Sequence, residues 1–285
     1  MSSHRITRSV LALAAAGLMA AAAAGPAQAA DPVKYVNLGD SYSAGSGVLP
    51  LTSYNPVCLQ SARNWAHDIA SAKGYQLTDV SCGAAQTKDL RGSQYLGVAP
   101  QLDAVSADTD VVTITMGGND NNTFIGAITA CGTAAVATAG FGSPCKTLYG
   151  DTFTNAINNE TYPALVQGLR DIKAKAPNAK VMISGYPWIT PATGSCYPQL
   201  PIARGDVAYL HDLQTVLNSA VSRAAADTGA TYVDLSKVSA GHDACQAPDV
   251  RWVEPAIFTT QLVPVHPNAL GEQGMADAAV KQGRL

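Results

Sequence analysis

Hydrophobic residues along the chain alternate between short β-branched runs and stretches with a helical repeat. The segment 110–116, Asp-Val-Val-Thr-Ile-Thr-Met, has the strongest strand signal. Its apolar residues are almost continuous, as in a strand buried on both faces of a parallel sheet. In the segment 161–176, by contrast, Leu165, Leu169 and Ile172 recur at the spacing of one helix face. The same criteria predict strands at 34–38, 76–81, 110–116, 180–184 and 231–235, and helices at 64–73, 121–130, 161–176, 205–228 and, after the N-cap Asn268, through Lys281.

This alternation of strands and helices predicts one α/β domain, a mostly parallel sheet of about five strands with helices on both faces. No internal repeat and no linker to a second domain is visible. Ligands of such sheets bind beyond the carboxyl ends of the strands. Three predicted strands end in loops that carry Ser41, Asn119 and Tyr186, so we expect these residues along one edge of the sheet.

The first 29 residues have the pattern of a secretory signal peptide. Arg5 and Arg8 precede an Ala/Leu-rich apolar core at 10–24, and Ala27-Gln28-Ala29 forms a small-x-small cleavage site. An uncleaved membrane anchor is the alternative, because residues 9–30 carry no charge and nearly span a bilayer. The Ala-x-Ala motif at the end of the apolar core favours a cleaved signal peptide. We therefore expect a signal peptide at 1–29 and a single secreted, extracellular domain at 30–285.

Composition narrows the function of the remaining chain of about 256 residues, which is long enough for one α/β core. Without the two signal-peptide arginines it carries 16 basic and 21 acidic residues, a net charge of −5. Nucleic-acid binding needs a basic stripe, which this chain lacks. No nucleic-acid partner is expected.

Six cysteines follow the cleavage site, and an even number in an exported chain indicates disulfides. A zinc site is disfavoured, because there is no Cys-x-x-Cys pair. Six cysteines allow fifteen pairings. We adopt sequential pairing, which closes three separate loops: Cys58–Cys82, Cys131–Cys145 and Cys196–Cys245.

Ser41 is the candidate nucleophile, because the apolar run at 36–38 breaks there into a Gly/Ser-rich turn. Gly, Asp and Ser are also ordinary turn residues, so the serine alone decides nothing. A serine nucleophile needs a base, and histidine is the usual one. His4 leaves with the signal peptide, and the remaining histidines are His67 and His211 in predicted helices, His242 beside an aspartate, and His266 in the loop before the closing helix.

Four sequence blocks, in order, resemble those of one family, the SGNH or GDSL hydrolases. The segment Gly39-Asp40-Ser41-Tyr42-Ser43-x-Gly45 resembles the first block and Gly83 the second; Gly117-Gly118-Asn119-Asp120 resembles the third and His266 the last. Each motif alone is weakly specific, but together they span nearly the whole mature chain. The exported chain with six sequentially paired cysteines is most similar to the secreted, disulfide-bonded bacterial lipases and esterases of that family (bacterial lipase family II).

The resemblance implies a flavodoxin-like, three-layer α/β/α sandwich and a role for each motif residue. Ser41 would be the nucleophile and His266 the base. The oxyanion hole would consist of the Ser41 N–H, the Gly83 N–H and the Asn119 side-chain amide. Asp40 and Asp120 belong to the motifs but are expected to fix turns. No metal or organic cofactor is required.

One departure from the family pattern concerns the histidine. The family often has an aspartate three residues before it, where this chain has Val263. Some secreted members similarly lack this acid and hold the histidine with a backbone carbonyl. We therefore predict a Ser41–His266 dyad oriented by the carbonyl of Val263 or Pro264. The alternative is a triad completed by a distant acid, such as Asp243, Asp249 or Glu254.

The predicted reaction is hydrolysis of a small-molecule or lipid ester, by a lipase or esterase acting on acylglycerols or other acyl esters. A phospholipase A or an acetyl-polysaccharide esterase would use the same chemistry, and a non-catalytic secreted binding protein is the alternative of a different class. We expect a monomer without stable membrane insertion. Two roles are open for a set of apolar residues near the loops, which either line an acyl groove or pack under the long loops: Leu49, Leu51, Tyr54, Tyr186, Trp188 and Ile189.

Overall fold

The centre of the fold is one five-stranded parallel sheet with the strand order β2-β1-β3-β4-β5. The computed structural model describes residues 31–285, and residues 32–285 form one compact unit. The expected signal peptide and its cleavage site lie outside the described residues. The strands are β1 (Lys34–Gly39), β2 (Gln76–Asp79), β3 (Val111–Thr115), β4 (Lys180–Ser184) and β5 (Thr231–Val233).

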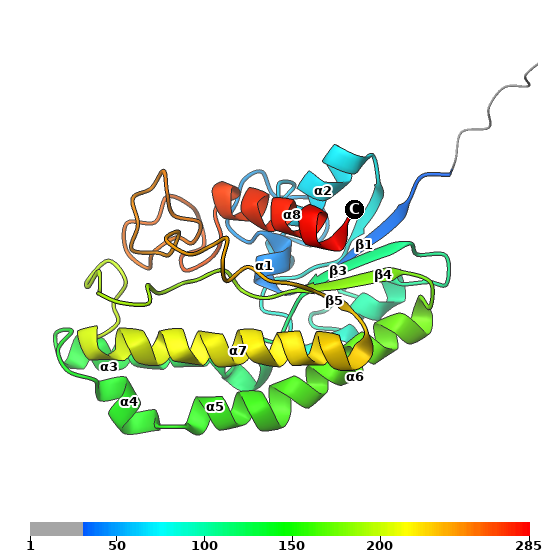
Figure 1. Cartoon of the computed structure of the whole chain (residues 1–285). Helices are drawn as coiled ribbons and strands as arrows, with labels where there is room; N and C mark the ends of the chain where they lie inside the picture. Colours follow the sequence, from blue (N-terminus) through cyan, green and yellow to red (C-terminus); the bar gives the residue numbers. More distant parts are fainter. Residues whose placement is uncertain (1–30) are drawn as a thin grey trace, which may run out of the picture. The chain divides into compact units, whose positions relative to one another are not determined.

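Helices cover both faces of this sheet, as Figure 1 shows. On one face, the apolar side of α6 and the C-terminal half of α7 pack on alternate residues of the strands, such as Val112 and Ile114. On the other face, α2 and α8 pack against the intervening residues, such as Tyr35 and Val111. The helices are α1 (Ser41–Ala44), α2 (Trp65–Lys73), α3 (Phe124–Ala137), α4 (Pro144–Tyr149), α5 (Thr152–Ala156), α6 (Tyr162–Lys175), α7 (Val207–Thr228) and α8 (Ala269–Gly283).

The strand order creates a switch point between β1 and β3. From β1 the chain moves first to β2 on one side and then returns to β3 on the other. At such a point the loops after two adjacent strands diverge and leave a crevice at their carboxyl ends. The loop after β1 carries Ser41 and the loop after β3 carries Asn119, so the expected three-layer fold brings the candidate residues to one edge.

The region after β3 differs from the prediction. The helix expected at 121–130 begins only at Phe124, because Asn121 and Asn122 adopt positive φ angles of 51° and 54°. It then continues to Ala137, through an Ala-rich stretch with high helix propensity. The expected loop after residue 130 is thus partly helical, and the Cys131–Cys145 disulfide joins α3 to α4.

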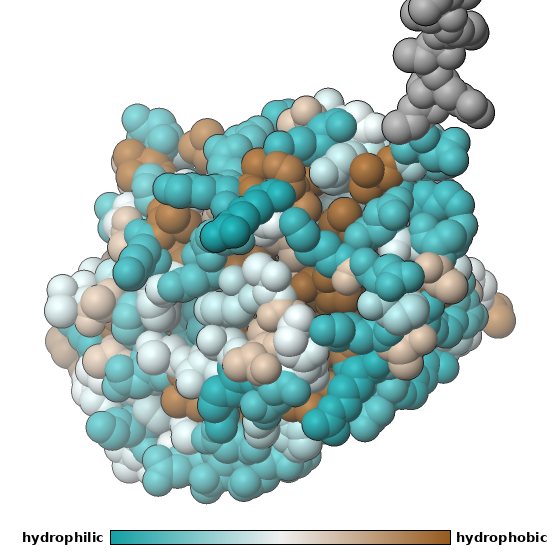
Figure 2. All heavy atoms as spheres, turned by 45° about the vertical axis from the view of Figure 1, so that its right-hand side comes forward, coloured by the Kyte–Doolittle hydropathy of each residue, from teal (hydrophilic) through white to brown (hydrophobic). Residues whose placement is uncertain are grey.

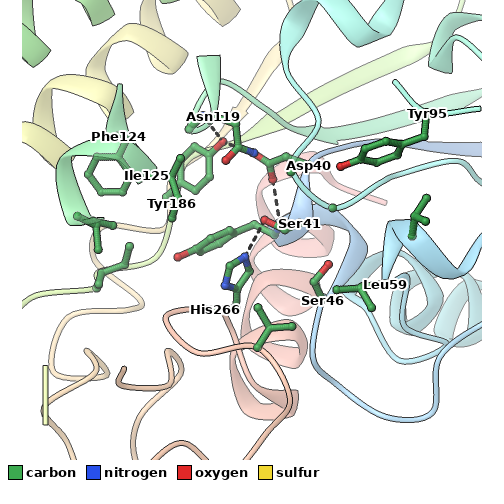
Figure 3. Close-up of a pocket in the computed structure, with 18 residues that line it drawn as sticks. Asp40, Ser41, Ser46, Leu59, Tyr95, Asn119, Phe124, Ile125, Tyr186 and His266 are labelled. Carbon is green, nitrogen blue, oxygen red and sulfur yellow. Dashed lines mark hydrogen bonds between the residues drawn. The ribbon is translucent and has the colours of Figure 1, made fainter. Parts of the chain in front are cut away.

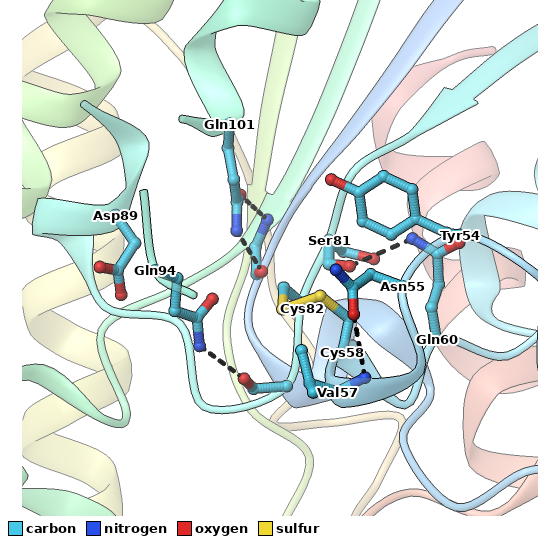
Figure 4. Close-up of a disulfide and its surroundings, with 12 residues drawn as sticks. Tyr54, Asn55, Val57, Cys58, Gln60, Ser81, Cys82, Asp89, Gln94 and Gln101 are labelled. Atoms are coloured by element: carbon cyan, nitrogen blue, oxygen red, sulfur yellow. Dashed lines mark hydrogen bonds between the residues drawn. A yellow bond between two sulfur atoms is a disulfide. The ribbon is translucent and has the colours of Figure 1, made fainter. Parts of the chain in front are cut away.

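The three disulfides pair the cysteines in sequence order. Cys58–Cys82, Cys131–Cys145 and Cys196–Cys245 connect positions 24, 14 and 49 residues apart. Figure 4 shows the first of them beside the segment that follows β2. Each bridge ties an irregular segment or a short helix to the domain, while the sheet itself is held by hydrogen bonds and packing.

No helix within residues 31–285 is long and apolar enough to cross a membrane. Figure 2 shows one face of the molecule, on which hydrophilic side chains surround small, separate apolar areas. Scattered apolar atoms of this kind are normal on a folded surface.

Candidate active site

Ser41 stands at the tip of β1, at the first position of the short helix α1. Gly39 ends the strand with a φ of 127°, and a Cβ there would lie 2.4 Å from the carbonyl oxygen of Thr115. Asp40 caps α1 by accepting the Tyr42 N–H at 3.0 Å. The chain therefore turns sharply from strand to helix, and the turn directs the serine to the edge of the sheet.

The imidazole of His266 contacts Ser41 directly (Figure 3). Its Nε2 lies 2.7 Å from the Ser41 Oγ, and its Nδ1 lies 2.8 Å from the carbonyl oxygen of Pro264. Burial lowers the pKa of His266 below 6.5, while the hydrogen bond to Pro264 opposes this shift. The imidazole is therefore neutral at neutral pH. With Nδ1–H donating to the carbonyl, Nε2 is an acceptor for the serine proton.

The loop that carries His266 is held by Tyr42. The Tyr42 hydroxyl donates to the carbonyl oxygen of Val265 at 2.8 Å, and its ring lies 5.1 Å from the imidazole. Val265 itself has a φ of 58°, a left-handed conformation that is rare for a β-branched residue. Tyr42, the residue after Ser41, thus fixes the backbone beside His266.

Of the two predicted orienting carbonyls, the structure places that of Pro264 on the imidazole. The Val263 carbonyl instead accepts from the Gln261 side chain at 3.1 Å. Within residues 31–285, no carboxylate is hydrogen-bonded to His266.

The three acids considered as triad members have other surroundings. Asp243 accepts from the Cys245 N–H and from Gln246, and Asp249 is exposed. Glu254 is fully buried, and its carboxylate accepts hydrogen bonds from Arg251, Thr260 and Asn268.

The predicted oxyanion donor Gly83 needs correction. Its N–H already donates to the carbonyl oxygen of Cys58 at 2.8 Å, while its own carbonyl accepts from Gln94 at 2.7 Å (Figure 4). The next residue, Ala84, has a φ of 63° and lines the cavity at Ser41. Its N–H has no acceptor among the described residues. Sequence reasoning missed Ala84 because glycine, not alanine, is the usual signal of a left-handed residue.

Two further donors lie at the same place. The Ser41 N–H has no acceptor in the described part of the chain. The Asn119 Nδ2 uses one hydrogen on the carbonyl of Ala85 at 3.1 Å and keeps its second hydrogen free, since an amide nitrogen carries two. Both residues, with Ala84, line one cavity.

The cavity has a volume of about 290 Å³ and is mainly apolar. Of the expected acyl-groove residues, Tyr186 and Ile189 line it; Leu49, Leu51, Tyr54 and Trp188 do not. In Figure 3, apolar walls stand on both sides of Ser41. Residues that sequence reasoning missed supply them: Leu59 and Tyr95 lie on one side, and Phe124 and Ile125 on the other. Val57 and Ile128 also line the cavity.

One buried hydroxyl in this cavity is unpartnered. Ser46 is 1% exposed and lines the cavity, and its Oγ has no hydrogen-bond partner among the described residues. An unsatisfied buried hydroxyl costs about 1–3 kcal/mol. Ser46 is therefore available to a polar atom of a bound molecule.

The other histidines among the described residues contact neither Ser41 nor His266. His67 bonds Asn64 within the cap of α2, and His211 stacks on Trp188. His242, the competitor with an acid beside it, places its Nδ1 2.5 Å from the carbonyl oxygen of Val250 and stacks on Trp252. Of residues 31–285, His266 is the histidine that the fold brings to Ser41.

The two motif aspartates contact backbone and hydroxyl groups rather than Ser41 or His266 side chains. Burial raises the pKa of Asp40 to about 7, while hydrogen bonds from Tyr186 and the Tyr42 N–H oppose the rise. Asp120 accepts the N–H and the hydroxyl of Thr87 at 2.8 and 2.6 Å. Both carboxyls thus hold loops in place.

A parallel α/β sheet with a serine–histidine pair at its carboxyl edge is the architecture of a serine hydrolase. Residues 38–273 match the sequence model of the GDSL-like Lipase/Acylhydrolase family, and the chain belongs to this family of carboxylic ester hydrolases. It is 60% identical to Lipase 2 of Streptomyces coelicolor, over 90% of this chain and 88% of that protein.

Two solved structures have the same fold. A phospholipase A1 from Streptomyces albidoflavus superposes with a TM-score of 0.74 at 26% identity. An extracellular lipase from Streptomyces rimosus superposes with a TM-score of 0.74 at 28% identity. In both cases the match covers 88% of this chain and 99% of the other. The predicted family, the α/β fold and the ester-hydrolase class are confirmed.

Proposed function

We propose that the protein is a secreted lipase or esterase that cleaves acyl esters with a Ser41–His266 dyad. The observation that carries this proposal is the 2.7 Å contact between the Ser41 Oγ and the His266 Nε2, with Nδ1 held by a backbone carbonyl. The signal-peptide pattern of residues 1–29 supports export.

In the proposed mechanism, His266 removes the Ser41 proton as the serine attacks the ester carbonyl. The bond to the leaving alcohol then breaks, and His266 returns the proton to the alcohol oxygen. Water repeats both steps on the acyl-enzyme and releases the acid. The Pro264 carbonyl takes the orienting role of a triad aspartate, although as a neutral dipole it stabilises the imidazolium less than a carboxylate would.

The negative oxygen of the tetrahedral intermediate requires donors that are unused in the resting protein. We assign this role to the Ser41 N–H, the Ala84 N–H and the Asn119 amide, because each has a hydrogen without an acceptor among the described residues. Ala84 replaces Gly83, whose N–H is occupied by Cys58. Loss of one such donor typically costs about 10²–10³ in kcat.

The apolar cavity favours acylglycerols and other acyl esters with an aliphatic chain. Its walls on either side of Ser41 offer burial to hydrocarbon, and each buried CH₂ contributes about 0.8 kcal/mol, or roughly fourfold in affinity. A phospholipase A activity is the second candidate. The similar fold of a phospholipase A1 supports it.

The dyad is tested by hydrolysis of p-nitrophenyl butyrate with the mature chain and a Ser41→Ala variant. We expect the variant to lose at least about 10³-fold in kcat while its melting temperature stays within a few degrees, since the nucleophile is gone and the fold intact. Ser71→Ala, on the exposed side of α2, is the matched control and keeps full activity. Activity retained by Ser41→Ala would reject the nucleophile.

Substrate preference is read from a series of p-nitrophenyl esters from acetate to palmitate. We expect kcat/KM to rise from acetate to medium chains and then level off, once the chain is longer than the cavity of about 290 Å³. A maximum at acetate would contradict the acyl-chain assignment and favour the acetyl-polysaccharide alternative. Cleavage of phosphatidylcholine vesicles, but not of tributyrin, would favour the phospholipase.

A further inference from the structure

Tyr186 lies between the two loops that carry Ser41 and Asn119. It follows β4 in the segment Gly185-Tyr186, and its side chain is 1% exposed. Its hydroxyl accepts the Gly118 N–H at 2.8 Å and donates to the Asp40 Oδ2 at 2.5 Å. A phenol has one donor and also accepts, so both bonds form at once. Figure 3 shows the ring among Asp40, Asn119 and Phe124.

Each of these two bonds reaches a group next to the proposed chemistry. Asp40 precedes Ser41 and uses its second carboxyl oxygen to cap α1, so it sets the turn that presents the nucleophile. Gly118 precedes Asn119, whose amide we assign to the oxyanion hole. One hydroxyl therefore links the nucleophile turn to the oxyanion loop.

Tyr186 is itself held rigidly. Its N–H donates to the Asn218 Oδ1 at 2.8 Å, and its carbonyl accepts from the Asn218 Nδ2 at 3.0 Å, which fixes its backbone to α7. Its ring packs edge-on against Tyr42 with 5.0 Å between centroids. A Cβ on Gly118 would lie 3.0 Å from the hydroxyl, so the oxyanion loop passes directly over the phenol.

We propose that Tyr186 is a positioning residue, which fixes the separation between the Ser41 hydroxyl and the Asn119 amide through Asp40 and Gly118. The proposal rests on the oxyanion role assigned to Asn119 above. The Tyr186 hydroxyl is fully occupied by protein groups, so it acts through them and not on the ester. Displacement of an oxyanion donor weakens the transition state more than the bound substrate, because the oxyanion exists only there.

The decisive variant is Tyr186→Phe, measured with p-nitrophenyl butyrate. We expect kcat to fall about ten- to hundredfold with KM changed less than about twofold, as for an interaction realised in the transition state. Tyr35→Phe is the matched control. Tyr35 is equally buried, and its hydroxyl lies 2.7 Å from the Thr113 Oγ1 in the other layer of the core. It loses a comparable hydrogen bond and keeps its kcat.

A double-mutant cycle with Asn119→Ala shows whether Tyr186 acts through that amide. If it does, adding Tyr186→Phe to Asn119→Ala lowers kcat by less than about threefold, because the donor it positions is already absent. Fully multiplicative losses would overturn the proposal, as would an unchanged kcat in Tyr186→Phe. Activity in Ser41→Ala would instead reject the proposed function itself, so the two failures are distinguishable.

A second variant, Gly118→Ala, tests the same contact without changing Tyr186, in case Tyr186→Phe does not fold. Gly118→Ala adds a methyl group 3.0 Å from the same hydroxyl and disturbs the same contact from the other side. Its backbone has no positive φ, so the strain comes from the new methyl group, which would lie 3.0–3.2 Å from the Tyr186 hydroxyl and ring. We expect the same signature of lowered kcat and unchanged KM. An unchanged kcat here would count against the proposal.

Discussion

At the scale of single residues, the histidine without a carboxylate is the most distinctive feature. His266 is oriented by the Pro264 carbonyl, and Tyr42 fixes the adjacent backbone through Val265. A buried carboxylate behind the imidazole would favour its charged form and raise its pKa. A neutral carbonyl does so less, and burial of the ring then dominates and lowers the pKa.

This predicts hydrolysis that persists on the acid side of neutrality. In the proposed mechanism the neutral imidazole is the base, so activity is expected to fall only as the pH drops through its lowered pKa. The measurement is kcat/KM for p-nitrophenyl butyrate from pH 4.5 to pH 8 (roughly the range in which a histidine titrates). An acid limb centred well above pH 6.5 that persists in an Asp40→Asn variant would contradict the burial argument.

Asp40 is the other group near Ser41 that titrates in this range, since burial raises its pKa to about 7. The groups that face it are Tyr42, Tyr186 and, at longer range, Asp120. Asp40→Asn separates the two contributions, because the amide does not titrate. The acid limb that this variant retains belongs to His266.

At the scale of elements, the segment before α8 supports the base through a buried ion pair. The Glu254 N–H donates to the His266 carbonyl at 3.0 Å, and the Val265 N–H donates to the Glu254 carbonyl at 3.0 Å. Burial alone would raise the pKa of Glu254, but hydrogen bonds from Arg251 and Asn268 lower it, so the carboxylate is charged. Arg251 and Glu254 are 2% and 0% exposed.

We therefore expect Glu254→Ala to act on stability and not on the chemical step. Removing one partner of a buried ion pair leaves the other uncompensated, at a cost of about 3–5 kcal/mol. Urea unfolding measures this loss, and kcat per folded molecule, at a temperature where the variant is native, should fall less than about tenfold. A drop near 10⁴, as for a triad aspartate, would mean that Glu254 is the missing catalytic acid. Asp249→Ala, which changes an exposed residue, is the control.

Sequence patterns predicted the strands of the sheet well, because a short, continuous run of β-branched residues favours a buried strand over other secondary structures. The strand at 180–184 has its predicted bounds, and β3 lies within the expected 110–116. The start of α3 was predicted wrongly, because the left-handed φ angles of Asn121 and Asn122 leave no periodic trace in the sequence.

Site residues could be predicted where a sequence motif contains them. They could not be predicted where the role of a residue depends on whether its N–H is already hydrogen-bonded in the folded chain. Ser41, Asn119 and His266 could be singled out in this way. Gly83 was assigned because it matches the glycine of the family motif, and the sequence does not reveal that the Cys58 carbonyl occupies its N–H. Tyr186 was expected to line an acyl groove, and only the folded chain places its hydroxyl between Asp40 and Gly118.

At the scale of the whole molecule, the disulfides differ in what they hold. Cys58–Cys82 brings the Cys58 carbonyl to the Gly83 N–H, next to the proposed donor Ala84. Cys196–Cys245 closes a longer loop, and neither of its residues lines the cavity. Separations of 24 and 49 residues correspond to similar stabilisation, about 3.5 and 4 kcal/mol in the chain-entropy model.

Replacing each pair by serines should therefore separate stability from catalysis. We expect both double variants to lose about 2–4 kcal/mol in denaturant unfolding. In addition, Cys58→Ser with Cys82→Ser should lower kcat under native conditions, because the loop that carries Ala84 is released. Cys196→Ser with Cys245→Ser should leave kcat unchanged. Equal kcat in the two variants would contradict a link between the first disulfide and the oxyanion hole.

Ser41 and His266 are 225 positions apart, so they are added at two different times in the synthesis of the chain. At roughly 5–20 residues per second, a ribosome needs about 10–45 s to pass from one to the other. Throughout that interval the growing polypeptide has the proposed nucleophile but not the proposed base, so no ester cleavage by the dyad is expected. If the dyad carries the activity, as proposed, the order of the two residues delays ester cleavage until synthesis of the chain is almost complete.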